Sequence, residues 1–248
     1  MKRKIILFNG LLIFFIVNLF SENTIRIPKA RNVYIKTINT IESNEKNMKK
    51  FNENDYPRIT KDKILINRIS FYDMNENLLV VSDKMEINNI LFNNASNIFL
   101  CLRYDDILKT EKKNSLYLFD FTEGIQEQID VDVHTYSLSN DGKQVFYVTK
   151  FRYPESMDFY FTIFENKKRK TKVINYKQFT NELCDSIKIK QENEYLSLYL
   201  YQDACVILKL YFDYNCNIVH YALPKYDENI GVSYIINPEG NKDYLNKQ

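Results

Sequence analysis

The sequence predicts an all-β fold assembled from repeated antiparallel sheets, each of four short strands. Three observations lead to this prediction. The chain contains 19 Tyr and 17 Phe besides abundant Ile, and these residue types favour strands. Two kinds of hairpin turn alternate along the sequence. Turns of each kind recur about every 47 residues, a period typical of a four-stranded repeat unit.

The first kind of turn is clearest at Asp141-Gly142, between the two apolar runs of SLSNDGKQVFYVTK. Asp-Gly in this position is a strong hairpin signal, because Gly adopts the positive φ that a primed turn needs. We expect related turns at Asn94-Ala95, Glu192-Asn193 and Glu239-Gly240. Ala95 departs from the pattern, since the other second positions are Gly or Asn, which tolerate left-handed backbone.

In the second kind of turn, an acidic residue ends an apolar strand and begins a polar turn. The residues concerned are Asp73, Asp120, Glu165 and Asp213. Asp side chains favour such turns because they accept hydrogen bonds from nearby backbone amides. Two hairpins in each period give four strands in each unit, which is the pattern of a β-propeller blade.

The two ends of the repeat each supply half a unit. Residues 63–82 form only a second hairpin, and residues 231–246 form only a first hairpin. We expect them to pair in one sheet and close a ring of four blades, because propellers leave few sheet edges exposed. A fifth blade has room in residues 24–41, where one or two strands are expected around Ile25, Ile27, Val33, Ile35, Ile38 and Ile41. The alternative is a β-sandwich, whose strands would connect by Greek-key crossings.

Two of the hairpins resemble the repeat of TolB-type periplasmic propellers, which carries a Ser-Pro-Asp-Gly-Lys turn between two strands. Ser139, Asp141, Gly142 and Lys143 match this turn, with Asn140 in place of Pro. A second copy matches at Pro238, Glu239 and Gly240. The resemblance covers about 14 residues of each blade and concerns the fold alone. It implies an exported scaffold that binds partners, and it carries over no catalytic residue.

The first 21 residues have the order of a secretory signal peptide. Lys2-Arg3-Lys4 is basic, residues 5–20 carry no charge, and Ser21 precedes a polar sequence. Leu19 is poorly suited to processing, so an uncleaved N-terminal anchor is the alternative. We expect an exported protein that is periplasmic, associated with the cell envelope or secreted, and that has no membrane span after removal of the signal.

The remaining segments complete the predicted organisation. Residues 22–62 are read as N-terminal strands followed by a polar linker, and residues 63–248 as the propeller-like domain. Within that domain, residues 103–113 and 152–157 are expected to be loops, and residues 176–184 a short helix. The sequence contains four cysteines, Cys101, Cys184, Cys205 and Cys216, which allow three disulfide connectivities. None is in a C-x-x-C pair, so no redox or zinc motif is indicated, and buried free thiols are the favoured interpretation.

Two polar patterns were weighed as binding sites. Asp130, Asp132 and His134 alternate in IDVDVH, which would place two carboxylates and an imidazole on one side of a strand, in reach of a divalent metal. A half-buried outer strand shows the same alternation, and that interpretation is favoured. The basic run Lys167–Lys170, with Lys172, is interpreted as a solvated hairpin tip rather than a phosphate-binding site.

The aromatic clusters are expected to fill the core rather than to bind sugars or peptides. They are Phe151-Tyr153, Phe159-Tyr160-Phe161 and Tyr195-Tyr199-Tyr201. His220 is expected to be structural. A net charge of +2 gives no field that favours nucleic acid.

The sequence predicts no catalytic, cofactor-binding or metal-binding residue, since it has no phosphate-binding glycine loop, H-E-x-x-H motif or nucleophile elbow. Our functional hypothesis is an exported, non-enzymatic binding or scaffold protein of the cell envelope. Its partner would be a protein or an envelope component. The alternative is a glycan-directed propeller hydrolase, which would use paired carboxylates.

Overall fold

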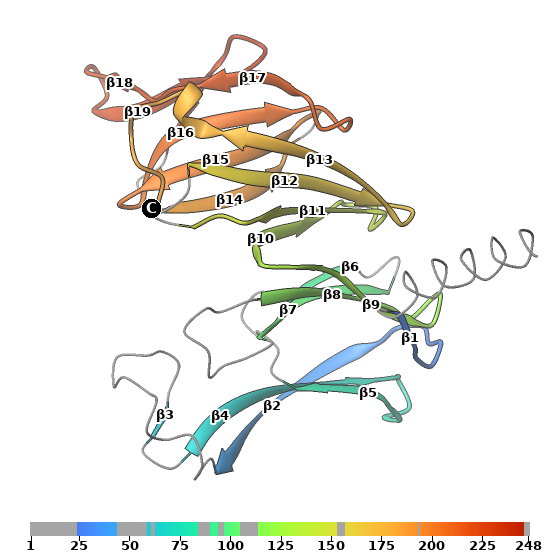
Figure 1. The fold of residues 1–248 in the computed structure, drawn as a ribbon. Helices are drawn as coiled ribbons and strands as arrows, with labels where there is room; N and C mark the ends of the chain where they lie inside the picture. Colours follow the sequence, from blue (N-terminus) through green and yellow to red (C-terminus); the bar gives the residue numbers. More distant parts are fainter. Residues whose placement is uncertain are drawn as a thin grey trace, which may run out of the picture. The chain divides into compact units, whose positions relative to one another are not determined.

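The computed structural model describes residues 24–43, 59–60, 63–83, 90–93, 97–104, 114–152, 157–192 and 194–245 (Figure 1). The chain divides into two compact units, with the boundary after Asp130. Among these residues, no helix is long and apolar enough to cross a membrane.

The first unit contains two antiparallel sheets. In one, β4 (Lys63–Tyr72) lies between β2 (Tyr34–Ser43) and β5 (Leu78–Asp83), and the short strand β3 (Ile59–Thr60) also pairs with β4. The other has the order β1-β9-β8-β7-β6, and its strands are β1 (Thr24–Arg26), β6 (Leu91–Asn93), β7 (Ile98–Tyr104), β8 (Asn114–Asp120) and β9 (Ile125–Val131).

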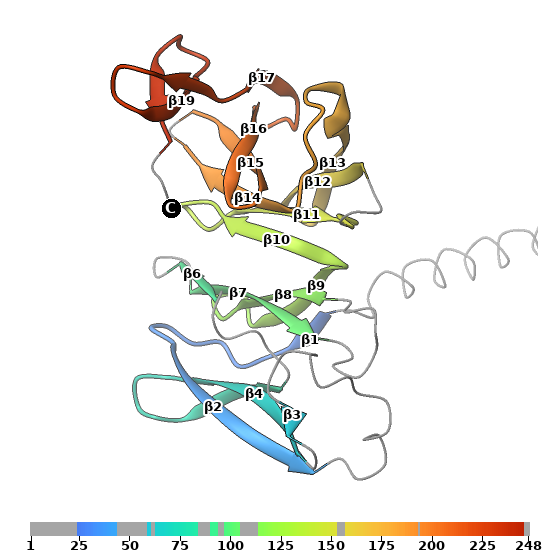
Figure 2. The same ribbon diagram turned by 90° about the vertical axis from the view of Figure 1, so that its left-hand side faces the viewer.

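The second unit contains three antiparallel sheets of consecutive strands (Figure 2). The first consists of β10 (Val133–Leu138), β11 (Gln144–Thr149), β12 (Asp158–Glu165) and β13 (Lys168–Asn175). The second consists of β14 (Ser186–Gln191), β15 (Leu196–Gln202), β16 (Cys205–Phe212) and β17 (Ile218–Ala222). The third consists of β18 (Lys225–Asp227), β19 (Val232–Ile236) and β20 (Lys242–Tyr244).

Each unit has its own apolar core between its sheets. In the first unit, Phe71 packs against Phe99, Phe119 and Phe121, with ring centroids 4.8 to 5.1 Å apart. In the second unit, aromatic side chains of β12 meet the leucines of β15 and β16, and Phe161 lies 4.6 Å from Phe212. Of the predicted aromatic clusters, Phe151, Phe159, Phe161 and Tyr201 are buried as expected, whereas Tyr160, Tyr195 and Tyr199 are only half-buried.

The predicted fold class is confirmed: the protein is all-β, with blade-like sheets of consecutive antiparallel strands. Strand pairs β10 to β13 and β14 to β17 follow sequence order, as blades do and Greek-key sandwiches do not. Both strands expected within residues 24–41 are present as β1 and β2. The short helix expected after residue 175 is a single 3₁₀ turn at Tyr176–Gln178.

The hairpins form where both kinds of turn predicted them, and four of the turns share one geometry. In each, the carbonyl of the first residue accepts a bond from the amide of the fourth, and the fourth residue has left-handed backbone. The first and fourth residues are Asp73 and Glu76, Ser139 and Gly142, Asp213 and Cys216, and Asn237 and Gly240. The Asp73 and Asp213 side chains also accept backbone amide bonds of 2.8 to 2.9 Å, as expected of Asp at a turn.

The turn type expected at Asp141-Gly142 is wrong. A primed turn centred on Asp141-Gly142 needs positive φ at Asp141, but of the two residues only Gly142 has it, at +74°. The Ser139 hydroxyl accepts the Gln144 amide, which fixes the longer loop instead. A primed pair does occur after Glu165, where Asn166 and Lys167 have φ values of +50° and +62°.

The predicted pairing of the first and last hairpins is also wrong. The hairpin β4-β5 pairs with β2 over ten residues, from Tyr34 opposite Tyr72 to Ser43 opposite Lys63. The hairpin β19-β20 pairs instead with β18. β2 pairs with β4 over ten residues, whereas β20 is only three residues long and would form fewer hydrogen bonds with β4. The described residues therefore form five sheets.

Several predictions fall outside the described residues. These are the signal peptide 1–21, the Asn94-Ala95 turn, Asn193, Tyr153 and most of the loops 103–113 and 152–157 and of the linker 42–62. The boundaries at residues 21 and 62 stay predictions.

Candidate functional site

The sheet β14–β17 has one apolar face and one face rich in Tyr and Lys. Its register places Tyr199 opposite Lys209, and Tyr211 opposite both Ser197 and His220. Directly paired residues lie on the same side of a sheet, so these five side chains share a face, which we call the tyrosine face. The alternate residues of β15 and β16 are leucines that enter the core.

A carboxylate at the end of β14 organises the tyrosine face. Both oxygens of the Glu192 carboxylate accept hydrogen bonds from Lys209 Nζ, at 2.8 and 2.9 Å. The Tyr199 hydroxyl donates to the same carboxylate at 2.6 Å, and Ser197 Oγ donates at 3.0 Å. The Lys209 side chain is 1% exposed and that of Glu192 is 24% exposed, so this is a largely buried ion pair.

The two charges are mutually stabilised in their ionised forms. Burial alone would raise the pKa of Glu192, but the hydrogen bonds from Lys209 and Tyr199 outweigh it and hold that pKa below its ordinary value. Burial lowers the pKa of Lys209, and the Glu192 carboxylate opposes this shift only in part. Lys209 thus carries a buried positive charge whose main compensation is one carboxylate.

Two aromatic rings complete the surroundings of the ammonium. Lys209 Nζ lies 4.6 Å from the centre of the Tyr199 ring and 4.3 Å from that of the Tyr211 ring. Such contacts are favourable for a desolvated cation. The buried Tyr211 hydroxyl has no hydrogen-bond partner among the described residues, and burial raises its pKa.

The sheet β18–β20 covers part of the tyrosine face. Ile235 is fully buried against Tyr211 and Ala222, and Tyr195 and Leu245 pack at the border of this cluster. A ring nitrogen of His220, Nε2, lies 3.2 Å from the Ile236 carbonyl oxygen, as expected for a structural histidine. The tyrosine face therefore acts chiefly as a stiff internal layer, and every group of the ion pair is engaged within the sheet.

Exposed apolar side chains are frequent in the stretch of the chain from β17 to β20. Of the fifteen large hydrophobic residues exposed in the described part of the chain, six lie between residues 219 and 244. We call them the C-terminal apolar set: Val219, Tyr221, Leu223, Tyr226, Ile230 and Tyr244. Within this stretch, Lys242 of β20 forms an ion pair with Asp227 of β18 at 2.8 Å, and the Tyr244 hydroxyl donates to Asp227 at 3.5 Å. These residues hold the short sheet together while presenting apolar groups to solvent.

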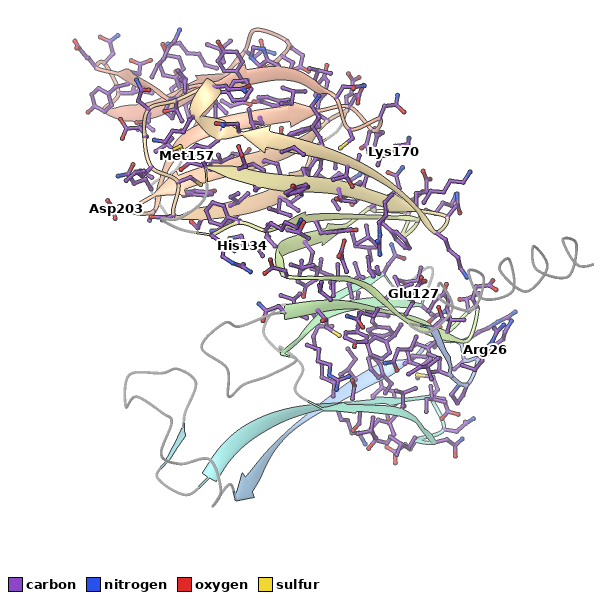
Figure 3. All side chains as sticks on the ribbon, in the orientation of Figure 1. Arg26, Glu127, His134, Met157, Lys170 and Asp203 are labelled. Atoms are coloured by element: carbon purple, nitrogen blue, oxygen red, sulfur yellow. The ribbon has the colours of Figure 1, made fainter. Side chains whose placement is uncertain are left out.

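The structure does not bring Asp130, Asp132 and His134 to one side of a strand. Asp132 has left-handed backbone, φ +59°, and it separates β9 from β10. Its carboxylate pairs with Arg152 at 2.6 Å, and the His134 ring packs against Phe151 at 4.7 Å (Figure 3 labels His134). In the described residues, no group of three metal-binding side chains is close enough to hold an ion. The single-strand interpretation of IDVDVH was therefore wrong.

The basic run lies where the sequence placed it, at the β12–β13 hairpin. The side chains of residues 168–172 are exposed, and Lys170 Nζ bonds Asn215 Oδ1 at 3.2 Å (Figure 3). All four cysteines are free thiols. Cys101, Cys184 and Cys216 are buried as expected, whereas Cys205 is exposed, so the expectation of a buried thiol is wrong at that position.

The Glu192–Lys209 pair was not predicted from the sequence, where Glu192 is expected only in a turn. A signal was present, however, because Lys209 is the one charge within the apolar strand CVILKLYF. Lysine is almost never fully buried without a partner, so this position should have prompted a search for an acidic neighbour.

No protein-family model and no curated protein matches the chain. Two solved structures from Pyrococcus are similar over most of it. The propeller domain of the Trilobed protease from Pyrococcus furiosus, described as having an open velcro topology, is 8% identical with a TM-score of 0.42. The match covers 91% of this chain and 58% of that one. The acylaminoacyl peptidase of Pyrococcus horikoshii is 9% identical with a TM-score of 0.38, over 90% of this chain and 39% of that one. The chain spans about half the length of these two solved structures or less.

Proposed function

We propose that the chain is an exported, non-enzymatic binding protein of the cell envelope. Its sheets serve as a rigid support, and the C-terminal apolar set contacts a partner protein. The observation that carries this proposal is the concentration of six of the fifteen exposed large hydrophobic residues in residues 219–244. The six share one stretch of the chain rather than one face of a sheet, because Tyr226 pairs with Ser233 and Tyr244 pairs with the next residue, Tyr234. A stretch this rich in exposed apolar side chains is a candidate for partner binding.

The partners of the acidic side chains favour binding over hydrolysis. A glycosidase needs two carboxylates that face each other across a substrate. Here Glu192 is engaged by Lys209, Asp132 by Arg152 and Asp227 by Lys242. Asp73 and Asp213 accept backbone amides in turns. These acids are committed to structure, which supports a binding role.

Site-specific photocrosslinking tests the proposal. A benzophenone amino acid would replace Tyr226, and in separate variants Tyr244, in the cells that produce the protein. The matched control carries the same group at the exposed Lys168 of β13. We expect a discrete protein adduct at both tyrosine positions and none at residue 168, with the chain in the envelope or exported fraction. Equal adducts at all three positions, or none at any, would exclude this surface as the binding site.

A further inference from the structure

Three runs of four consecutive antiparallel strands in this protein end in equivalent outer strands, and the three outer strands are protected differently. They are β9, β13 and β17, each the fourth strand of its run of consecutive hairpins. An outer strand has one row of backbone donors and acceptors without a partner in its own hairpin series. Natural proteins cover such edges or place charges on them, because bare edges pair with other chains.

The outer strand β9 is covered by strand addition. Residues 24–26, about a hundred positions earlier in the chain, pair with it antiparallel as β1, with Thr24 opposite Glu127 and Arg26 opposite Ile125. Figure 3 labels Arg26 and Glu127 on these two strands. Outside this short strand, the Ile27 amide bonds the Gly124 carbonyl at 3.0 Å. The protein therefore already uses an extended segment to complete one blade.

The outer strand β13 is protected by charge. Its sequence, KRKTKVIN, has four basic residues in its first five positions, and these side chains are exposed. A second strand that approached this edge would meet a row of positive charges. Lysine on an edge strand is a common device against unwanted pairing.

The outer strand β17 has neither of these two protections. Its pairing with β16 shifts register between Tyr211 and Phe212, at Val219, and the ring of Tyr221 lies 5.1 Å from that of Phe179, but no strand pairs with its outer edge among the described residues. Its sequence is IVHYA, which carries no Lys, Arg, Asp or Glu, and β16 is its only partner strand in the described part of the chain. Val219 is 47% exposed and Tyr221 is 50% exposed. His220, between them, turns its ring to the Ile236 carbonyl. β17 is thus an uncharged edge flanked by exposed apolar side chains.

We infer that β17 is a strand-addition site that takes an extended segment of a partner protein, as β9 takes β1. The occupant is a stretch of at least three to five residues in extended conformation, with apolar side chains at every second position to meet Val219 and Tyr221. Main-chain hydrogen bonds to β17 would supply affinity, and the alternate side chains would supply selectivity. This inference rests on the proposed function and names the kind of partner segment that the C-terminal apolar set receives.

A labelled octapeptide, Ser-Thr-Ile-Thr-Val-Thr-Tyr-Lys, is a suitable probe because its apolar residues alternate. We expect saturable binding by fluorescence anisotropy, and slower hydrogen exchange at the β17 amides that do not pair with β16. Val219→Lys should weaken binding at least tenfold. The control Val173→Lys places the same charge at an exposed valine of β13 and should change binding less than twofold. Methylating the peptide nitrogens in two alternating sets should abolish binding for one set only, because an added strand turns every second amide towards its neighbour.

Several outcomes would overturn the inference. Absence of saturable binding would do so, as would equal sensitivity to Val219→Lys and Val173→Lys or to both methylation patterns. A dimer by sedimentation that Val219→Lys dissociates would instead assign the edge to a second copy of this chain. If the adduct at Tyr226 persists in a protein that binds no extended peptide, the proposed function stands and the strand-addition site is excluded.

Discussion

Removing the charge of Glu192 should destabilise the protein far more than removing the charge of its partner. In Glu192→Gln, the Lys209 ammonium stays 1% exposed and loses its only anionic partner in the tyrosine face. Breaking a buried pair in this way costs about 3–5 kcal/mol. In Lys209→Met the apolar stem is kept, and the carboxylate left behind is 24% exposed and still accepts the Tyr199 and Ser197 hydroxyls. We expect a smaller loss, of about 1–2 kcal/mol.

Urea unfolding followed by circular dichroism would measure both losses. With a slope of roughly 2–3 kcal/mol per molar urea, Glu192→Gln should lower the midpoint by about 1–2 M. The double variant Glu192→Gln/Lys209→Met should be more stable than Glu192→Gln alone, because the orphaned charge is gone. The coupling between the two sites should then be about 2 kcal/mol. The control Lys190→Met removes an exposed lysine of β14 and should change stability by less than about 0.5 kcal/mol. Equal losses in the two single variants that simply add in the double variant would refute this account of the pair.

Three further predictions concern pH, turns and thiols. Because the pKa of Glu192 is lowered on folding, its contribution to the free energy of unfolding is complete above its unfolded pKa of about 4.3 and is lost as pH falls through the lower folded value. In Lys209→Met, melting temperatures measured from pH 2 to 6 should therefore fall less steeply with decreasing pH. Gly240→Ala should lower the free energy of unfolding by about 1 kcal/mol, because φ is +85°; no atom lies within 4 Å of the new Cβ, so backbone strain is the only cost. Glu76→Gly, at φ +64°, should raise the free energy of unfolding by about 0.5 kcal/mol. Thermal melts would measure both changes. Only Cys205 of the four thiols should react with Ellman's reagent in the native protein, since the other three are buried, and all four should react in denaturant; rapid native reaction of a second thiol would contradict the packing.

The hairpins could be predicted because their causes are local. An Asp such as Asp73 or Asp213 bonds amides two and four residues ahead, so the turn is encoded within five positions of sequence. The turn type at Asp141-Gly142 was missed because the Ser139 hydroxyl, not the central pair alone, decides the length of the loop. The break at Asp132 was missed for a related reason: alternation in IDVDVH reads as one strand unless the left-handed residue is known.

The features that escaped prediction depend on pairings between distant segments. Glu192 and Lys209 are 17 residues apart and meet only because β14, β15 and β16 take one particular register. The added strand β1 lies about a hundred residues from β9, and three residues of sequence carry no sign of their partner. Composition and periodicity report which segments are strands. They do not report which edge each strand will occupy.

The shared turn explains why the repeat did not predict how the chain ends. The same bond from the fourth amide to the first carbonyl, with a left-handed fourth residue, occurs at both positions of the repeat, as at Ser139 and at Asp213, so the repeated element is the hairpin and not the complete blade. Hairpins can be combined with any available strand, which is why β4-β5 takes β2 and β19-β20 takes β18. A protein built by this rule generates an outer edge wherever a run of hairpins stops, and each edge then needs its own solution. β1 covers β9, lysines protect β13, and the uncharged β17 is the edge that this reasoning leaves for a partner.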